Sequence, residues 1–326
     1  MLVCLYEDRP QQVAGLKILL LSLARYCPSW PVRLRFPCIG SEFRIWLEQF
    51  PTLTLIEDPL LLSGSYDVKP TVLLDGLNSG ASQCLWLDTD VLVNGSLQFL
   101  EQTTPETVIV TQDPWEYSDG ATHRSETWGL TQGRSLPGPL NSAVVRVTEQ
   151  HVGLIKAWQS ILTTRRYMAE QAKPVGERNR HMLGDQDAIS ALLASAEFAQ
   201  LPVRRLRHSA EILQHHGAGA YAIKQRWENF KHGLPPLVHA MGSTKPWKMP
   251  INPNFRIQAR DYYERVYLEL SPYVHLARQY RALLGEPAEW LNIRTAAGIV
   301  STLITFNRPV LKGAIQAEIH RRFVTG

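Results

Sequence analysis

The sequence predicts an α/β fold with a mainly parallel sheet flanked by helices, and three observations support this prediction. In the first half of the chain, short apolar runs alternate with longer segments of helical periodicity, the pattern of strand–helix–strand units. The chain has 326 residues, enough for one large domain with an appendage or for two domains. Hydrophobic residues make up 44% and charged residues 20%, which excludes the disordered, collagen-like and coiled-coil classes.

The first predicted elements are strands that end at polar residues and a helix that follows from apolar spacing. Residues 2–6 form an apolar run that stops at Glu7 and Asp8, which predicts a strand. Residues 13–26 place apolar side chains at helical intervals. The elements that come next are strands at 32–36 and 53–56, with an aromatic helical segment at 42–50 between them.

The middle of the chain continues the alternation and then loses it. A helix at 69–77 leads to a buried strand at 83–87, and a further strand covers 107–110. Residues 112–139 hold several aromatic residues, four glycines and three prolines, so we expect a long structured loop, which in a compact domain is usually functional. The later predicted elements are strands at 142–147 and 237–241, helices at 152–167 and 185–196, and a polar loop at 173–180.

Beyond residue 255 the pattern is helical, which predicts a main domain over 1–254 and a helical extension over 255–326. Four cysteines lie in apolar surroundings without C-x-x-C spacing, which favours buried, reduced thiols over a zinc site or a disulfide framework. The N-terminus lacks signal-peptide features, and no run approaches 18 apolar residues. We therefore expect a cytoplasmic protein. The formal charge of +4 comes without a nucleic-acid-binding motif, so nucleic acid is not an expected partner.

Two carboxylates at the end of an apolar strand are the sharpest local signal. Asp88 and Asp90 flank Thr89 between the runs CLWL and VLV, where charges are costly to bury unless they are paired or bind a cation. Open α/β folds also place their ligands at the ends of strands. A divalent cation held there would bridge nucleotide phosphates. The short pattern fits equally well a turn cap and an aspartate paired with an arginine.

A second signal is the segment HAMGSTKPW, which follows an apolar strand. His239 offers an imidazole nitrogen to a cation, Gly242 permits close approach of the backbone to a phosphate, and Lys245 supplies a positive charge. A third signal is Asp185-Gln186-Asp187 at a helix start, which capping alone would explain. Asn141, ahead of AVVRV, reads by itself as a turn residue.

Together these segments resemble the nucleotide-sugar glycosyltransferases of the GT-A fold. More narrowly, they are similar to the retaining family that includes glycogenin and the bacterial lipopolysaccharide galactosyl- and glucosyltransferases. The resemblance covers residues 1 to about 250 and depends on LDTDVLV, DQD and the motif H-x-x-G-x-x-K-P-W. The family usually has N-[AS]-G, whereas this chain has Asn141-Ser142-Ala143.

The resemblance implies a role for each of these residues. The implied ligands of a cation, Mn²⁺ or Mg²⁺, are Asp88, Asp90 and His239. The implied donor-binding residues are Tyr6, Asp8, Lys69, Asp88, Gly242 and Lys245. The implied catalytic residues are Gln186, Asp185 and Asn141, with Gln186 nearest the anomeric carbon. The implied reaction is transfer of a hexosyl group from a UDP-sugar to a saccharide or glycolipid hydroxyl, with retention, as in polysaccharide biosynthesis.

Two other functions fit parts of the sequence. A nucleotidyltransferase of similar fold would carry a glycine-rich basic loop after the first strand, and the segment EDRPQQVAGLK has no such cluster. A catalytically silent protein that binds nucleotide sugars would keep every phosphate contact, so the motifs do not separate it from an enzyme.

The net charge is concentrated in the C-terminal segment 294–326. This segment holds five basic residues and one acidic residue, so the rest of the chain is neutral. Pro309 is expected to separate two helices. One interpretation is that the helices pack on the main domain with solvated charges. The other is a peripheral contact with an anionic membrane surface at the inner face of the membrane. The charged residues are Arg294, Arg308, Lys312, Glu318, Arg321 and Arg322.

Overall fold

The computed structural model describes most of the chain and divides it into two compact units. The first unit comprises Met1–Pro10, Pro28–Thr89 and Leu97–Leu206, and the second comprises Gln11–Cys27, Asp90–Ser96 and Arg207–Gly326. The expected boundary between 1–254 and 255–326 lies outside the described residues. The described residues are 1–60, 66–113, 122–214, 223–242, 245–248, 269–285, 287–292 and 296–323.

The first unit is built on a seven-stranded sheet with the strand order β3-β2-β1-β4-β7-β6-β8. β7 runs antiparallel to its neighbours β4 and β6, and the other neighbouring strands are parallel. The predicted α/β class with a mainly parallel sheet is therefore confirmed. The strands are β1 (Leu2–Tyr6), β2 (Val32–Arg35), β3 (Leu53–Ile56), β4 (Gln83–Leu87), β6 (Val108–Gln112), β7 (Leu140–Thr148) and β8 (Val203–Leu206).

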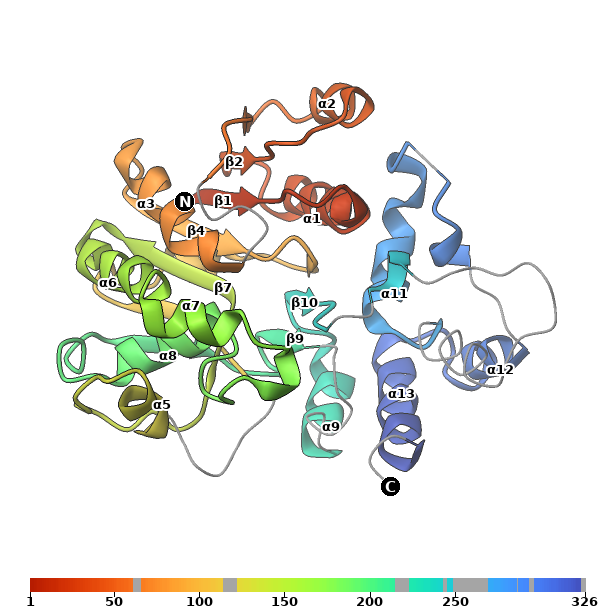
Figure 1. Ribbon diagram of the computed structural model, residues 1–326. Helices are drawn as coiled ribbons and strands as arrows, with labels where there is room; N and C mark the ends of the chain where they lie inside the picture. The colour runs from red at the N-terminus through yellow and green to blue at the C-terminus, as the bar shows by residue number, and fades with distance from the viewer. Residues whose placement is uncertain are drawn as a thin grey trace. The chain divides into compact units, whose positions relative to one another are not determined.

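Helices cover this sheet and complete its core. Figure 1 shows α3, α6 and α8 grouped beside the strands, and α3 and α8 contact β4 and β7 respectively. The large side chains of Trp158 and Tyr167 are buried in this layer. The helices of the unit are α2 (Ser41–Leu47), α3 (Lys69–Asn78), α4 (Gln98–Glu101), α5 (Thr122–Thr127), α6 (Val152–Leu162), α7 (Arg165–Gln171) and α8 (Asp185–Ala194).

The helix predicted at 152–167 is wrong in one respect, because the structure breaks it into α6 and α7. The hydroxyls of Thr163 and Thr164 donate to the carbonyls of Ser160 and Ile161, both at 2.8 Å, and so bond back to the preceding turn. Thr164 then caps α7 by accepting from the Tyr167 amide at 3.4 Å. Two adjacent threonines thus end one helix and start the next, a local competition that apolar periodicity does not report.

Four further differences separate the structure from the expected elements. The loop expected over 112–139 contains α5, whereas residues 114–121 lie outside the described part. β7 begins at Leu140, so Asn141 lies within a buried strand and not at a turn before it. β8 was not predicted, because two adjacent arginines in VRRL interrupt the apolar run. Cys38 is exposed, contrary to the expectation of buried thiols, because it lies in the turn after β2.

The second unit holds a three-stranded sheet with the order β5-β10-β9. β10 (Leu237–His239) runs antiparallel to β5 (Val91–Val93) and parallel to β9 (Ile212–Gln214). The long helix α1 (Val13–Tyr26), predicted with these bounds, contacts β5, and its Ser22 hydroxyl accepts from the Val93 amide at 3.1 Å. Asp90 therefore lies directly before β5, and His239 ends β10.

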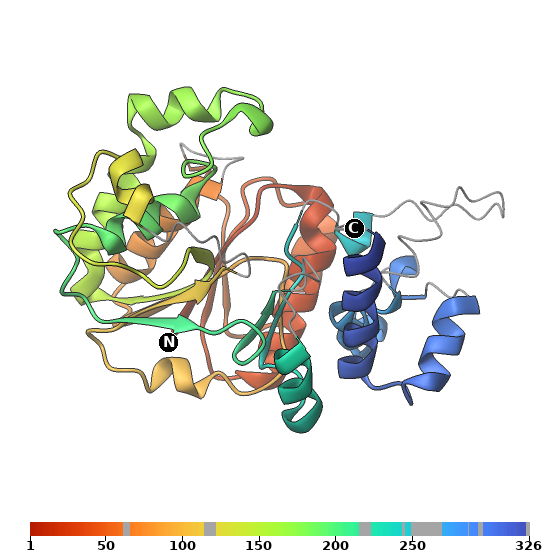
Figure 2. The same ribbon diagram turned by 90° about the horizontal axis from the view of Figure 1, so that it is seen from below.

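The described residues after 269 are helical, as expected. They include α11 (Pro272–Ala277), α12 (Ala296–Ile304) and α13 (Pro309–Phe323), and Figure 2 shows α12 and α13 as separate helices in blue. Pro309 begins α13, which confirms its predicted place between two helices. α9 (Ile223–His232), which was not predicted, precedes them and contacts α13. Within the described ranges we find no helix with the length and apolar character needed to cross a bilayer.

Candidate active site

The chain leaves β4 through Asp88, Thr89 and Asp90, and backbone and side-chain bonds hold this short segment. The Asp88 amide donates to the Ala143 carbonyl at 2.8 Å, and Trp86 Nε1 donates to Asp88 Oδ1 at 2.7 Å. The Thr89 hydroxyl donates to Glu7 Oε2 at 2.6 Å. Asp88 and Thr89 thus each have an anchor, and the Asp88 side chain is held in a defined position.

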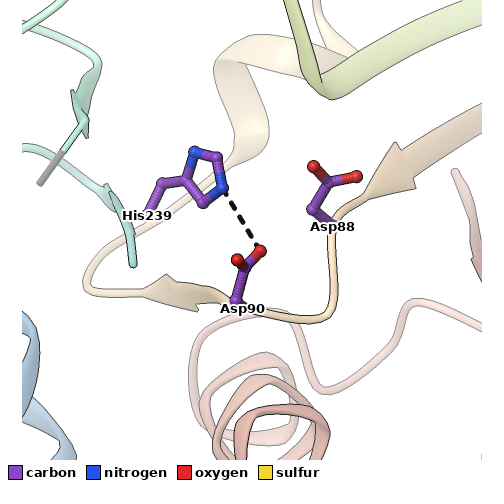
Figure 3. A group of neighbouring side chains, drawn as sticks. All are labelled: Asp88, Asp90 and His239. Atoms are coloured by element: carbon purple, nitrogen blue, oxygen red, sulfur yellow. Dashed lines mark ion pairs between the residues drawn. The ribbon is translucent and has the colours of Figure 1, made fainter. Parts of the chain in front are cut away.

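Asp88, Asp90 and His239 form a group that could hold a metal ion. Each offers one ligand atom, and these atoms all lie within 4.8 Å of one another. Figure 3 shows the three side chains gathered at this place. His239 Nε2 lies 3.2 Å from Asp90 Oδ1. Two carboxylate oxygens and one imidazole nitrogen form a mixed oxygen and nitrogen set, which suits a divalent cation such as Mn²⁺. The residues present therefore fit a cation, and their donor chemistry leaves its identity open.

The orientation of His239 depends on a residue that the sequence did not reveal. Gln214 ends β9, beside β10, and its Oε1 lies 2.6 Å from His239 Nδ1. When Nδ1 donates its proton to this amide oxygen, Nε2 keeps its lone pair and faces the carboxylates. Gln214 closes a short apolar strand without any motif around it, so only the pairing of β9 with β10 shows its role.

Asp90 is also in contact with Lys245 from the motif downstream. The two side chains form an ion pair, and the Lys245 ammonium donates to the Ala240 carbonyl at 2.8 Å. Burial alone would raise the pKa of Asp90, but the positive charge of Lys245 and the adjacent His239 imidazole outweigh it and hold that pKa well below its ordinary value. Gly242 lies between Ala240 and Lys245 and has a φ of 112°. Residues with a side chain rarely adopt this backbone angle, so the path of the chain here requires glycine.

Lys69 occupies the corresponding place beside Asp88. Its Nζ lies 3.0 Å from Asp88 Oδ1 and 3.2 Å from Asp185 Oδ2, and it donates to the Ser142 hydroxyl at 2.7 Å. Burial lowers the pKa of Lys69, but the carboxylates of Asp185 and Asp88 outweigh this and raise it overall. For Asp185 burial dominates, and its pKa is raised despite Lys69 and Ser142. Lys69 is thus a buried cation held between two predicted site carboxylates.

Asn141 and Gln186 meet next to this cluster. Asn141 Nδ2 donates to Gln186 Oε1 at 3.0 Å, while Asn141 Oδ1 accepts from the Ala143 amide at 2.9 Å. This pair of bonds orients both amide groups. Gln186 is half-buried, so its side chain keeps an accessible side.

The two aspartates that flank Gln186 have different surroundings. Asp185 accepts from the Ser142 hydroxyl at 2.5 Å and faces Lys69. Asp187 pairs with Arg124, with 2.8 Å between Oδ1 and Nε, and accepts from the Leu183 amide at 2.9 Å. Asp187 thus has structural contacts with Arg124 and with the Leu183 amide just before the helix, whereas Asp185 points into the cluster around Lys69.

Tyr6 and Asp8 lie at the end of β1. The Tyr6 hydroxyl donates to Asp8 Oδ2 at 3.0 Å. Between them, Glu7 is 1% exposed and holds Arg9 Nε at 2.7 Å as well as the Thr89 hydroxyl. Glu7 thus ties the end of β1 to the segment between the two aspartates.

Comparison with known proteins identifies the fold. No family model matches the sequence, and no curated protein matches it significantly. The galactosyltransferase LgtC, solved with donor and acceptor sugar analogues, gives a TM-score of 0.51 at 15% identity, covering 90% of this chain and 100% of that chain. An active-site mutant of LgtC gives 0.50 at 15% identity, with coverages of 89% and 99%.

A second protein of similar fold is longer. The apo structure of the bifunctional glycosyltransferase WbbM gives a TM-score of 0.50 at 13% identity, covering 76% of this chain and 46% of that one. This chain thus spans less than half of the WbbM chain. At these identities the likeness concerns the fold, and the predicted fold class is confirmed: the chain has the GT-A fold.

Proposed function

We propose that the protein is a cation-dependent glycosyltransferase that moves a hexosyl group from a UDP-sugar to a hydroxyl of a saccharide or glycolipid, with retention. The observation that carries this proposal is the group formed by Asp88, Asp90 and His239, at the strand ends of a GT-A fold. We assign this activity to residues 1–254, with 255–326 as a helical extension. The glycosyltransferase activities of LgtC and WbbM support the class of reaction.

The cation, Mn²⁺ or Mg²⁺, would supply positive charge to the departing diphosphate. Asp88, Asp90 and His239 would hold it, with Gln214 keeping His239 Nε2 available. Gly242 and Lys245 would hold the diphosphate itself. Tyr6 and Asp8 would contact the nucleoside.

The donor sugar would lie against the amides of Asn141 and Gln186. The Gln186 carbonyl, oriented by Asn141, would present its negative end to the carbon that becomes positive as the glycosidic bond breaks. An active-site glutamine of LgtC has been replaced by glutamate, which supports a glutamine in such a place. Lys69 would contact the donor sugar or a phosphate. Asp185 would position the Lys69 ammonium through the ion pair between these two residues.

A binding and turnover experiment tests this function. UDP binding is measured by calorimetry with and without Mn²⁺ on wild type, Asp90→Asn and the exposed control Asp58→Asn, and hydrolysis of UDP-sugars is measured in parallel. We expect Mn²⁺-dependent binding that only Asp90→Asn removes, together with turnover of a donor. Binding that ignores Mn²⁺ contradicts the site. Tight binding without turnover of any donor indicates a silent nucleotide-sugar-binding protein.

We further propose that the C-terminal helices contact an anionic membrane surface at the inner face of a membrane. On α12 the apolar side chains of Ile299, Val300, Leu303 and Ile304 are exposed, with Leu303 at 71%, and Phe306 beyond it is 83% exposed. Arg308, which follows, is exposed and carries a charge complementary to anionic headgroups. Lys312 does not belong to this surface, because it is 1% exposed.

Point variants test this contact better than deletion, since Lys312 is part of a buried region. A double change, Leu303→Ser with Ile304→Ser, is expected to weaken sedimentation with anionic liposomes at least tenfold. Val175→Ser, an exposed apolar residue elsewhere, serves as the control. Unchanged liposome binding by the double variant would exclude α12 as the membrane contact. Binding of this surface to a protein partner in place of liposomes would also overturn the proposal.

A further inference from the structure

Lys245 pairs with a proposed cation ligand in the structure. Its ammonium forms an ion pair with Asp90 Oδ2 and donates to the Ala240 carbonyl at 2.8 Å, and its side chain is largely buried. Asp90 Oδ1 faces His239 Nε2 at 3.2 Å. The lysine assigned to the diphosphate is therefore bonded to the carboxylate assigned to the cation.

A cation and the Lys245 ammonium compete for the same carboxylate. Both are positive, and in a site this buried their repulsion is only weakly screened by solvent. A cation that takes Asp90 must therefore displace the ammonium or bind beside it at a cost. Displacement leaves the ammonium without its carboxylate until another anion accepts it.

The second lysine of the site differs in how firmly it is held. Lys69 contacts Asp88 at 3.0 Å but also Asp185 at 3.2 Å and the Ser142 hydroxyl at 2.7 Å. If Asp88 turned toward a cation, Lys69 would keep the carboxylate of Asp185. Among the contacts recorded for the described residues, Asp90 is the carboxylate partner of Lys245. Lys245 is thus the lysine that a cation would release.

We propose that Lys245 is a displaceable counter-ion, released from Asp90 by the cation and then taken up by the diphosphate of the donor. This inference rests on the proposed function, because it assumes that Asp90 binds a cation. Before the donor arrives, Lys245 neutralises Asp90 and disfavours cation binding. Once the diphosphate accepts the ammonium, that cost disappears, so cation and donor each strengthen the binding of the other.

This arrangement predicts an effect of unusual sign. Removing a residue that merely supports a metal site weakens cation binding. Replacing Lys245 by glutamine removes the competitor, so we expect Mn²⁺ to bind at least fivefold more tightly in the absence of nucleotide. The same variant should bind UDP more weakly in the presence of Mn²⁺, because the diphosphate loses its cationic partner.

The test measures Mn²⁺ affinity of the full chain without nucleotide, from the electron paramagnetic resonance signal of free Mn²⁺. The variants are Lys245→Gln, Lys245→Arg, which keeps a cation on Asp90, and Lys248→Gln, which removes an exposed charge three residues away. Circular dichroism checks that each is folded. We expect tighter binding for Lys245→Gln alone, with Lys245→Arg and Lys248→Gln close to wild type.

The possible outcomes separate this inference from the proposed function. If Asp90→Asn abolishes Mn²⁺ binding while Lys245→Gln leaves it unchanged or weaker, the counter-ion role is overturned and the cation site stands. If Lys248→Gln tightens binding equally, general charge removal explains the effect and the inference fails. If Asp90→Asn leaves Mn²⁺ binding intact, the cation site itself is wrong. Binding too weak to measure in wild type but measurable in Lys245→Gln supports the inference.

Discussion

At the residue scale, the site depends on side chains that orient other side chains. His239 presents Nε2 to the carboxylates because Gln214 Oε1 faces its Nδ1 at 2.6 Å. Asn141 bonds to Gln186 at 3.0 Å and orients its amide. A substitution in the His239–Gln214 pair should therefore affect cation binding, and a substitution in the Gln186–Asn141 pair should affect turnover.

Gln214→Leu removes the acceptor of His239 Nδ1, which helps to fix the tautomer and orientation of the imidazole. Partners of this kind typically contribute 10- to 100-fold to metal affinity, so we expect Mn²⁺ to bind about 10-fold or more weakly. Mn²⁺ titration measures this without any turnover. The exposed Gln102→Ala is the control, and an unchanged Mn²⁺ affinity for Gln214→Leu would show that Gln214 does not position His239.

Gln186→Ala removes the amide proposed to face the anomeric carbon. Since that interaction strengthens as positive charge develops, we expect kcat to fall by roughly 10²–10³ while donor affinity changes little. Steady-state kinetics and calorimetry with UDP measure the two effects. Equal loss of both would place Gln186 outside the reacting part of the donor sugar.

At the element scale, the start of α8 combines a structural residue with residues of the site. Asp187 and Arg124 form a buried ion pair that joins α8 to α5, whereas Asp185, two residues earlier, faces Lys69. Removing one partner of a buried pair typically costs about 3–5 kcal/mol. Asp187→Asn should therefore lower the melting temperature strongly, yet leave UDP affinity unchanged where the protein is folded. Unaltered stability would contradict this assignment.

α11 carries a histidine whose titration should affect stability. Burial, and then the charges of Lys312 and Arg278, lower the pKa of His275 to about 4. In an unfolded chain a histidine titrates near ~6.5, so the neutral form stabilises the fold above that pH, and the stabilisation is lost as pH falls from there toward 4. Melting curves at pH 7 and 4.5 should show a smaller loss for His275→Gln than for wild type. An identical loss in both proteins would exclude His275 as a cause.

At the scale of the whole molecule, the order and spacing of apolar runs and motifs along the chain predicted the fold. The side-chain contacts of the site depend on which segments meet in space. The strands 2–6, 53–56 and 83–87 and the helix 13–26 were predicted with their observed bounds, since each has clean apolar periodicity. Asp88, Asp90 and His239 were expected to meet, and their ligand atoms do lie close together. The contact of Lys245 with Asp90 could not be predicted, because it depends on where the chain returns after β10.

The GT-A fold does not by itself determine the stereochemistry of the reaction, and the surroundings of Gln186 bear on it. An amide is a weak nucleophile, and the nearby Asp185 is buried, bonded to the Ser142 hydroxyl at 2.5 Å and paired with Lys69. Neither group suits a covalent intermediate. Retention would therefore require the acceptor hydroxyl to attack from the side on which the diphosphate departs. The departing diphosphate would then accept the proton of that hydroxyl.

If the reaction proceeds with retention as proposed, the product keeps the anomeric configuration of the donor, as measured by proton NMR. We also expect mass spectrometry of the enzyme, incubated with a slowly reacting fluorinated donor, to show no covalent sugar. A product of opposite configuration would contradict retention. A sugar attached to Asp185 would instead show that this carboxylate leaves Lys69 and Ser142 during the reaction, which the buried contacts of the structure oppose.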